Sequence, residues 1–241
     1  MVKKRENRGK MNARITGALF ITATVAGVLA VIFFGSTLES PVDLAKISVN
    51  ETQIAIGALF YFIMAAACAG IAIPIYPILK QHNEGMALGA VGFRIIEGAL
   101  YMVGVMCVLG LVLLSQEFVD AVASADPYFQ TLGELLLAGQ DLAQVLVPGV
   151  FAFSLGALMY QFIFFQSKLI PRWLSVWGLI GSTLVFVSGM VTIFGGSALS
   201  PFSDLLNLPN FVGEMVLAVW LIVKGFNSSV IASDSVKIDT H

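Results

Sequence analysis

The stretch that decides the fold is VGFRIIEGALYMVGVMCVLGLVLL, residues 91–114. It is almost entirely apolar and long enough to cross a bilayer, since a spanning helix needs about 20 apolar residues. Arg94 and Glu97 nevertheless lie near its start. Residues three apart on a helix share one side, and Tyr101 lies close to the same line. The stretch therefore predicts a membrane-spanning helix with an internal charged pair.

The composition of the whole chain favours a membrane protein. Of 241 residues, 58% are hydrophobic and 12% are charged, and the mean hydropathy is +0.90. Soluble domains carry about 25% charged residues. We therefore expect an all-α fold, a polytopic membrane helix bundle.

Six apolar runs are long enough to span a membrane. The predicted spans cover residues 15–34, 54–79, 88–114, 145–165, 174–194 and 208–223. They lie in a membrane domain, 15–224, between a basic cytoplasmic tail, 1–14, and a polar cytoplasmic tail, 225–241. The acidic outer loop, 115–144, has leucines at roughly helical spacing, which predicts a short amphipathic helix there.

The basic residues predict the orientation. With six spans, 12 of the 13 Lys and Arg residues fall on one side, and Lys46 alone falls on the other. The second side holds nine Asp and Glu residues: Glu39, Asp43, Glu51, Glu117, Asp120, Asp126, Glu134, Asp141 and Asp204. Positive charge stays in the cytoplasm. Both termini are therefore predicted to be cytoplasmic, in a bacterial inner membrane.

The Arg94–Glu97 pair has three interpretations. It is a self-neutralising pair that ties the third span to its neighbours, a solvated cavity in which Glu97 contacts an ion or substrate, or a lipid head-group site at Arg94. Arg94 is close enough to the predicted cytoplasmic boundary to snorkel. Tyr160, Gln161 and Tyr76 reach a similar depth from other spans, so they are candidates to complete a polar cluster.

A second carboxylate, Glu214, is predicted to lie within the last span. It follows Asn210 by four residues, which places both on one side of the helix. Because Lys46 is the only base in the outer loops, we expect Glu214 to lack a cation, to be neutral at pH 7 and to donate a hydrogen bond. Structural hydrogen bonding and proton coupling are both open roles. The candidate intramembrane polar site is Arg94, Glu97, Tyr101, Gln161, Asn210 and Glu214.

Several chemistries are disfavoured by what the spans lack. His82 and His241 are the only histidines, and both lie outside the predicted spans. A haem or histidine-ligated metal within the membrane is therefore not expected, and no cofactor or metal is predicted. No serine lies in a G-x-S-x-G setting with a membrane histidine, which makes an enzyme the least favoured class. The sequence has no basic surface with interleaved aromatic residues, so nucleic-acid binding is not expected.

Three stretches together resemble a known family. FRIIEGALYMVGV follows the turn YPILKQHNEGMALGAVG, LIPRWLSVWGLIG opens the fifth span, and LPNFVGEMVLAVWLIVKG forms the sixth. In this order they resemble the bacterial integral-membrane family catalogued as domain of unknown function 4386, over about residues 13–225. The family pattern corresponds here to Arg94, Glu97, Pro209 and Glu214. The resemblance implies six membrane helices and no assigned activity.

Two function classes follow. The first is non-enzymatic binding of a lipid, a small ligand or a partner membrane protein, with membrane lipids as the general partners. The alternative is a small ion- or proton-coupled secondary transporter that uses Glu97 and Glu214.

Overall fold

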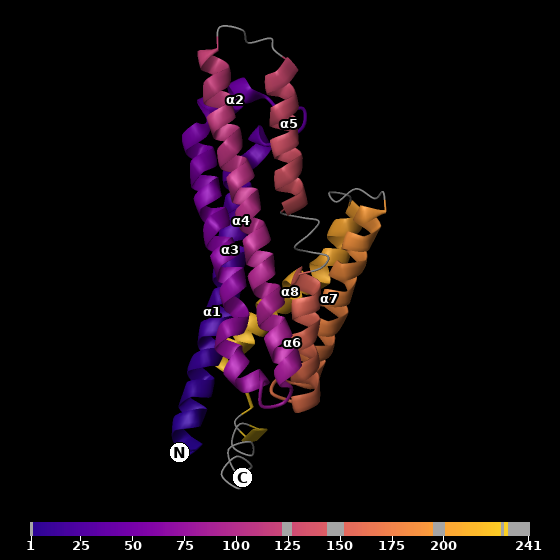
Figure 1. The fold of residues 1–241 in the computed structure, drawn as a ribbon. Helices are drawn as coiled ribbons and strands as arrows, with labels where there is room; N and C mark the ends of the chain where they lie inside the picture. Colours follow the sequence, from indigo (N-terminus) through magenta and orange to yellow (C-terminus); the bar gives the residue numbers. More distant parts are fainter. Residues whose placement is uncertain (1, 122–126, 144–151, 195–200, 228, 231–241) are drawn as a thin grey trace.

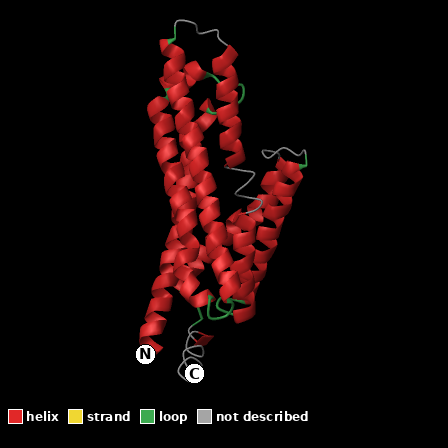
Figure 2. Ribbon diagram, viewed as in Figure 1, coloured by secondary structure: helices red, strands yellow, loops and turns green. Residues whose placement is uncertain are grey.

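The computed structural model describes residues 2–121, 127–143, 152–194, 201–227 and 229–230, and within these ranges the regular structure is helical (Figure 2). The helices are α1 (Val2–Phe34), α2 (Leu44–Val49), α3 (Glu51–Leu79), α4 (Glu84–Asp120), α5 (Pro127–Asp141), α6 (Ser154–Ser167), α7 (Arg172–Ile193) and α8 (Pro201–Val223). A short 3₁₀ turn, Gly35–Thr37, follows α1. The all-helical prediction is therefore confirmed.

Five of the predicted spans coincide with long apolar helices. α1, α3, α4, α7 and α8 are each long and apolar enough in their described parts to cross a membrane. The fourth predicted span, 145–165, lies partly outside the described residues, and its described part belongs to α6, which has 14 residues. The count of six crossings therefore stays a prediction. α5 occupies the segment where the outer loop was expected to form a helix.

Side-chain caps fix where two of the helices begin. The Asn83 side chain accepts a hydrogen bond from the backbone N–H of Met86 at 3.0 Å, before the first turn of α4. The Asp43 side chain accepts one from the N–H of Lys46 at 3.0 Å, before α2. These contacts satisfy backbone donors that have no partner within the helix.

The helices form a ring at one end of the molecule. Going round it, α1 packs against α3, α3 against α4, α4 against α6, α6 against α7, α7 against α8, and α8 against α1. At the other end, α2 and α5 both pack against α4 (Figure 1). The contact between α1 and α8 is close, since a Cβ on Gly17 would lie 2.6 Å from the Ala218 carbonyl oxygen.

Two apolar cores follow one another along the bundle. The core at the ring end includes Ile71, Phe164 and Leu221. The second core, at the α2–α5 end, includes Ile54 and Leu111. Arg94 and Glu97, in the first half of α4, lie close to the junction of these two cores.

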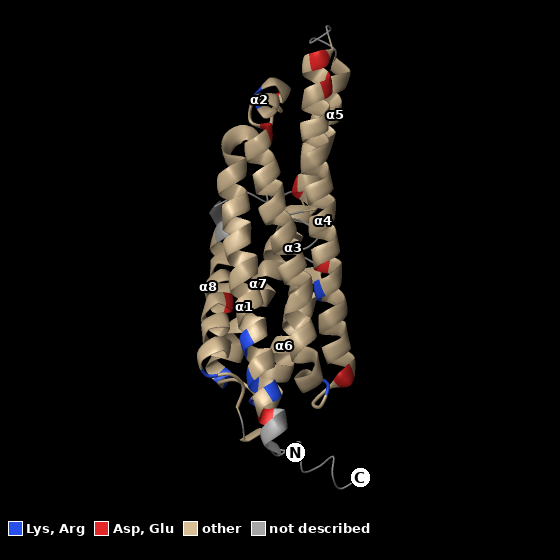
Figure 3. Cartoon of the chain, turned by 90° about the vertical axis from the view of Figure 1, so that its left-hand side faces the viewer, with Lys and Arg blue, Asp and Glu red and all other residues tan. Residues whose placement is uncertain are grey.

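Charge is divided between the two ends of the bundle. Most Lys and Arg residues lie at the end where α1 begins, whereas many Asp and Glu residues lie around α2 and α5 (Figure 3). The start of α1 and the end of α8 are at the same end, because a Cβ on Gly225 would lie 3.9 Å from side-chain carbons of Lys10 and Ala13. Which end faces the cytoplasm stays a prediction.

Candidate functional site

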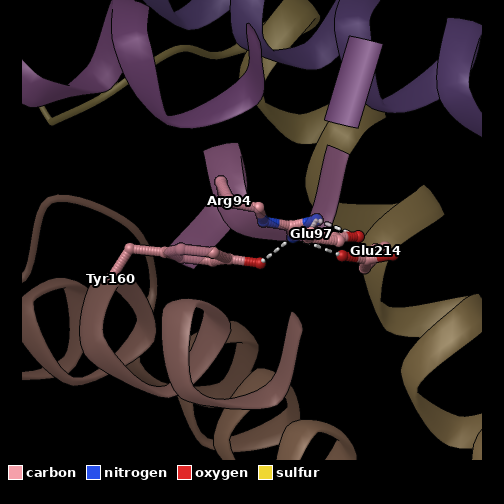
Figure 4. Close-up of polar contacts among 4 residues, drawn as sticks. All are labelled: Arg94, Glu97, Tyr160 and Glu214. Carbon is pink, nitrogen blue, oxygen red and sulfur yellow. Dashed lines mark hydrogen bonds and ion pairs between the residues drawn. The ribbon is translucent and has the colours of Figure 1, made fainter. Parts of the chain in front are cut away.

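Arg94 is the centre of the polar cluster. Its Nη1 donates to Glu97 Oε2 at 3.0 Å and Oε1 at 3.4 Å, one helical turn further along α4. Its Nη2 donates to the Tyr160 hydroxyl of α6 at 2.9 Å and to Glu214 Oε1 of α8 at 3.0 Å. Figure 4 shows the guanidinium between these three partners. The cluster therefore joins three helices that are far apart in the sequence.

Arg94 is close enough to the predicted cytoplasmic boundary to snorkel, but its side chain is buried instead. The residue is 1% exposed, and its guanidinium points into the bundle. The reason is that one carboxylate lies a turn away on the same helix, while a hydroxyl and a second carboxylate face it from α6 and α8. These charge-assisted hydrogen bonds replace the water that a snorkelling side chain would reach.

The expectation that Glu214 lacks a cation is wrong. Arg94 of α4 is its ion-pair partner at 3.0 Å. The basic residues of the outer loops do not reveal this pairing, because the cation lies within another predicted span, near its start. The protonation state of Glu214 stays a prediction that infrared spectroscopy can test.

Aromatic rings enclose the guanidinium. Arg94 Cζ lies 4.8 Å from the ring centroid of Phe153, 5.5 Å from that of Tyr160 and 5.6 Å from that of Phe20. A cation over an aromatic face gains electrostatic energy when it is desolvated. Arg94 Nε is buried without a hydrogen-bond partner among the described residues. The rings thus hold the guanidinium in an apolar setting that strengthens its ion pairs.

A groove of about 660 Å³ leads to this cluster. Its lining comes mainly from α1, α3, α4 and α8, and it includes Arg94, Glu97 and Glu214 at the polar end. On the α1 side it is lined by Val28, Val31 and Ile32, which are 48%, 58% and 63% exposed. The groove is therefore apolar along α1 and charged at its inner end.

The two carboxylates differ in access to the groove. The side chain of Glu97 is 2% exposed, whereas that of Glu214 is 19% exposed. One guanidinium and two carboxylates give the cluster a formal charge of −1 when all three are ionised. Glu214 is therefore the carboxylate that a molecule in the groove would meet.

The other predicted site residues divide into two groups. Tyr101 lines the groove, and its ring centroid lies 5.8 Å from that of Tyr61. Gln161 and Asn210 are buried but do not line the groove. Instead they pack against α7, Gln161 at Gly178 and Asn210 at Gly181. They separate from the cluster because each lies on the α7-facing side of its own helix.

Two site residues were not in the predicted set. Tyr160 was matched to Arg94 by depth alone, and the structure makes it a direct hydrogen-bond partner. Asn207 lines the groove, and its buried Oδ1 has no hydrogen-bond partner among the described residues. The signal for Asn207 was its spacing, since it precedes Glu214 by seven residues and so shares its helix face. Tyr76 lies elsewhere, with Lys80 Nζ 5.6 Å from its ring centroid.

Metal and thiol chemistry find little support in the described ranges. No group of three or more His, Cys, Asp and Glu side chains is placed there to hold a metal ion. Cys68 and Cys107 are free, and Cys68 lines the groove. The charged and amide groups that line the groove are the two carboxylates, the guanidinium and the Asn207 amide.

Comparison with known proteins identifies a family. No curated protein and no solved structure matches the chain. The family model described as "Domain of unknown function (DUF4386)" matches residues 15–225, which include every member of the Arg94 cluster. The resemblance based on the three sequence stretches is thereby confirmed. The chain, whose long apolar helices are those of a membrane protein, belongs to this family.

Proposed function

We propose that this protein binds an amphiphilic molecule, with an apolar tail and a cationic head, in the groove between α1 and α8. The observation that carries the proposal is the groove itself, apolar along α1 and ending at two carboxylates that share one guanidinium. Binding, rather than chemical conversion, is the proposed activity.

The tail fits the groove by size and lining. Small-molecule sites commonly occupy about 300–1,000 Å³ and are mostly apolar, and this groove has about 660 Å³. Val28, Val31 and Ile32 line it and remain half exposed along α1. An alkyl chain could therefore enter sideways from the surrounding lipid.

The head fits the charge at the inner end. Arg94 is shared between both carboxylates. When all three groups are ionised, the formal charge of −1 leaves room for one more cation. An ammonium group beside Glu214 would form a charge-assisted hydrogen bond and bring the cluster to neutrality. A carboxylate or phosphate head would add to the negative charge and is disfavoured.

The proposed setting is a bacterial inner membrane, crossed six times with both termini in the cytoplasm. The charge division between the two ends of the bundle supports this orientation. The start of α1 and the end of α8 lie at the same end of the bundle, which agrees with both termini being on one side of the membrane.

The test uses three photoreactive probes with the same diazirine-bearing alkyl chain and different heads: an amine, an alcohol and a carboxylate. The protein in lipid nanodiscs is irradiated with each probe, and the labelled peptides are mapped by mass spectrometry. We expect the amine to label α1 and α8 residues of the groove most strongly. Glu214→Gln should remove the preference for the amine.

A matched pair of variants provides the control. Val28 lines the groove and is 48% exposed, whereas Val25 does not line it and is 51% exposed, on the same helix. Val28→Trp should block labelling, and Val25→Trp should leave it unchanged. Equal labelling by all three heads, or equal labelling of the two tryptophan variants, would overturn the proposal.

A second candidate is proton-coupled transport through Glu97 and Glu214. The observation that favours it is that two carboxylates compete for one guanidinium, so one of them is in excess and able to accept a proton. Infrared titration of the carboxyl bands, with Glu214→Gln for assignment, tests this. A group that transfers protons works best when it titrates near the operating pH. A Glu214 band that shows no protonation change between about pH 5 and 9, an interval around neutral pH, would rule this candidate out.

A further inference from the structure

A second hollow lies at the ring end of the bundle, between the α6–α7 turn and the segment that follows α8. It has a volume of about 520 Å³, and its lining includes Lys168, Arg172, Lys224 and Trp220. None of its lining residues lines the groove at Arg94. We call this hollow the basic basin.

The basin is held in shape by contacts that do not involve its cations. The backbone N–H of Asn227 donates to the carbonyl of Leu169 at 2.8 Å, which fixes the segment after α8 against the α6–α7 turn. Phe226 is buried, and its ring centroid lies 5.8 Å from that of Phe164. The basin is therefore formed before anything binds in it.

The charge of the basin is uncompensated within the described part of the chain. Lys168, Arg172 and Lys224 are exposed, and no carboxylate is among the lining residues. Within the described ranges, the ion pairs are those of Arg94, and none joins these three cations to an acidic residue. The Arg172 guanidinium lies 5.7 Å from the Phe165 ring centroid, a contact that leaves its N–H donors available.

The backbone conformation of Lys168 would suit glycine better, which indicates that the lysine is kept for its charge. This residue caps α6 with φ 58° and ψ 28°, the left-handed conformation that glycine adopts without strain. A lysine there is less favourable for the turn than glycine. Its side chain nevertheless supplies one of the three positive charges of the basin.

Tryptophan residues indicate the depth of the basin in the membrane. The three tryptophans of the chain lie together, with the ring centroid of Trp173 at 6.3 Å from that of Trp177 and 6.4 Å from that of Trp220. Tryptophan is enriched where the membrane meets water, at the level of the lipid headgroups. Trp220 itself lines the basin.

We propose that the basic basin binds a phosphate group, carried by the headgroup of an anionic phospholipid or by a soluble phosphate ester. Arg172 offers a planar fork that matches two phosphate oxygens, and Lys168 and Lys224 add two point charges. Their position beside Trp220 makes phosphatidylglycerol a suitable lipid probe.

The test is native mass spectrometry of the protein released from nanodiscs that contain equal amounts of phosphatidylglycerol and phosphatidylcholine. We expect the wild type to retain phosphatidylglycerol preferentially. Lys224→Gln and Arg172→Gln should each lower that retention by about fivefold, the ratio that corresponds to about 1 kcal/mol per basic side chain at a membrane surface. Lys80→Gln, which removes a cation of the α3–α4 turn outside the basin, should leave it unchanged.

A further variant separates binding from folding. Lys168→Gly should preserve or raise the thermal stability, because glycine suits the left-handed backbone, and it should still lower phospholipid retention. The same sample with millimolar glycerol 3-phosphate distinguishes the two sources. If the protein binds glycerol 3-phosphate and shows no preference for phosphatidylglycerol, the basin binds phosphate and its ligand is a soluble phosphate ester.

Two results would overturn the proposal. One is an equal loss of phosphatidylglycerol from Lys80→Gln and Lys224→Gln, which would mean that general surface charge is responsible. The other is the absence of any preference for phosphatidylglycerol together with no bound glycerol 3-phosphate in the wild type.

Discussion

Replacing Arg94 by methionine should destabilise the bundle strongly, because it leaves the buried Glu97 and the partly buried Glu214 without their shared cation. Removing one partner of a buried ion pair costs about 3–5 kcal/mol. For a chain of this length, each kcal/mol corresponds to about 2–4 °C in the unfolding midpoint. The expected drop for Arg94→Met is therefore roughly 6–20 °C. The assay is thermal unfolding in detergent at pH 7.5, followed by tryptophan fluorescence.

The triple variant Arg94→Met, Glu97→Gln, Glu214→Gln isolates the charge. It removes the guanidinium together with both carboxylates, and replacing a whole buried ion pair is often nearly neutral. We expect it to recover most of the stability that Arg94→Met loses. If the triple variant is as unstable as Arg94→Met alone, the guanidinium acts by packing against Phe153 and its other aromatic neighbours, and the electrostatic reasoning is refuted.

The single glutamine variants should be milder, since each leaves one carboxylate paired with Arg94. Loss of one hydrogen bond to a charged group costs about 1.5–3 kcal/mol. Glu97→Gln should cost more than Glu214→Gln, because the Glu97 side chain is 2% exposed and that of Glu214 is 19% exposed. A Glu214→Gln protein that melts at or above the wild-type temperature would indicate that this carboxylate is kept for binding rather than for stability.

Three further predictions concern packing, the hydroxyl partner and orientation. Gly17→Ala should lower the melting temperature, because the new Cβ would lie 2.6 Å from a carbonyl oxygen of α8. Gly92→Ala should raise the melting temperature slightly, because the space around Gly92 is open and alanine favours a helix. The reverse order would mean that α1 and α8 do not cross so closely. Tyr160→Phe should cost about 1.5–3 kcal/mol in unfolding free energy, the value of a hydrogen bond to a charged group, and an unchanged melting curve would contradict the 2.9 Å contact. In a cysteine-free chain in intact cells, Val49→Cys should react with a membrane-impermeant maleimide and Lys80→Cys only after permeabilisation; labelling in the opposite order would reverse the proposed topology.

Part of the site could be predicted because helical spacing determines it. Arg94 and Glu97 are three residues apart, and a helix brings such side chains together whatever surrounds them. Their 3.0 Å ion pair is therefore a local consequence of the sequence. The five long apolar helices were predictable for a similar reason, since length and hydropathy are properties of a segment alone.

The rest of the site depends on how helices turn toward one another, which spacing within a helix does not determine. Tyr160 and Gln161 are neighbours in α6, at the same depth, yet Tyr160 faces Arg94 and Gln161 faces α7. In α8, Asn210 faces α7, whereas Asn207 lines the groove. The pairing of Glu214 with Arg94 needs α4 and α8 placed across one ring, and loop charges carry no information about that arrangement.

The two carboxylate partners of Arg94 become available at different moments of synthesis. Glu97 follows it by three residues, whereas Glu214 follows by 120. When α4 leaves the translocon, Arg94 and Glu97 can enter lipid already paired as a neutral couple. This pairing reduces an insertion cost of about 2.5–3.5 kcal/mol for an unpaired charge at mid-membrane. The second carboxylate arrives with α8, when α1 is already in place to receive it. The order of residues along the chain thus lets Arg94 enter the membrane early, paired with Glu97, and lets its site be completed late, when Glu214 arrives.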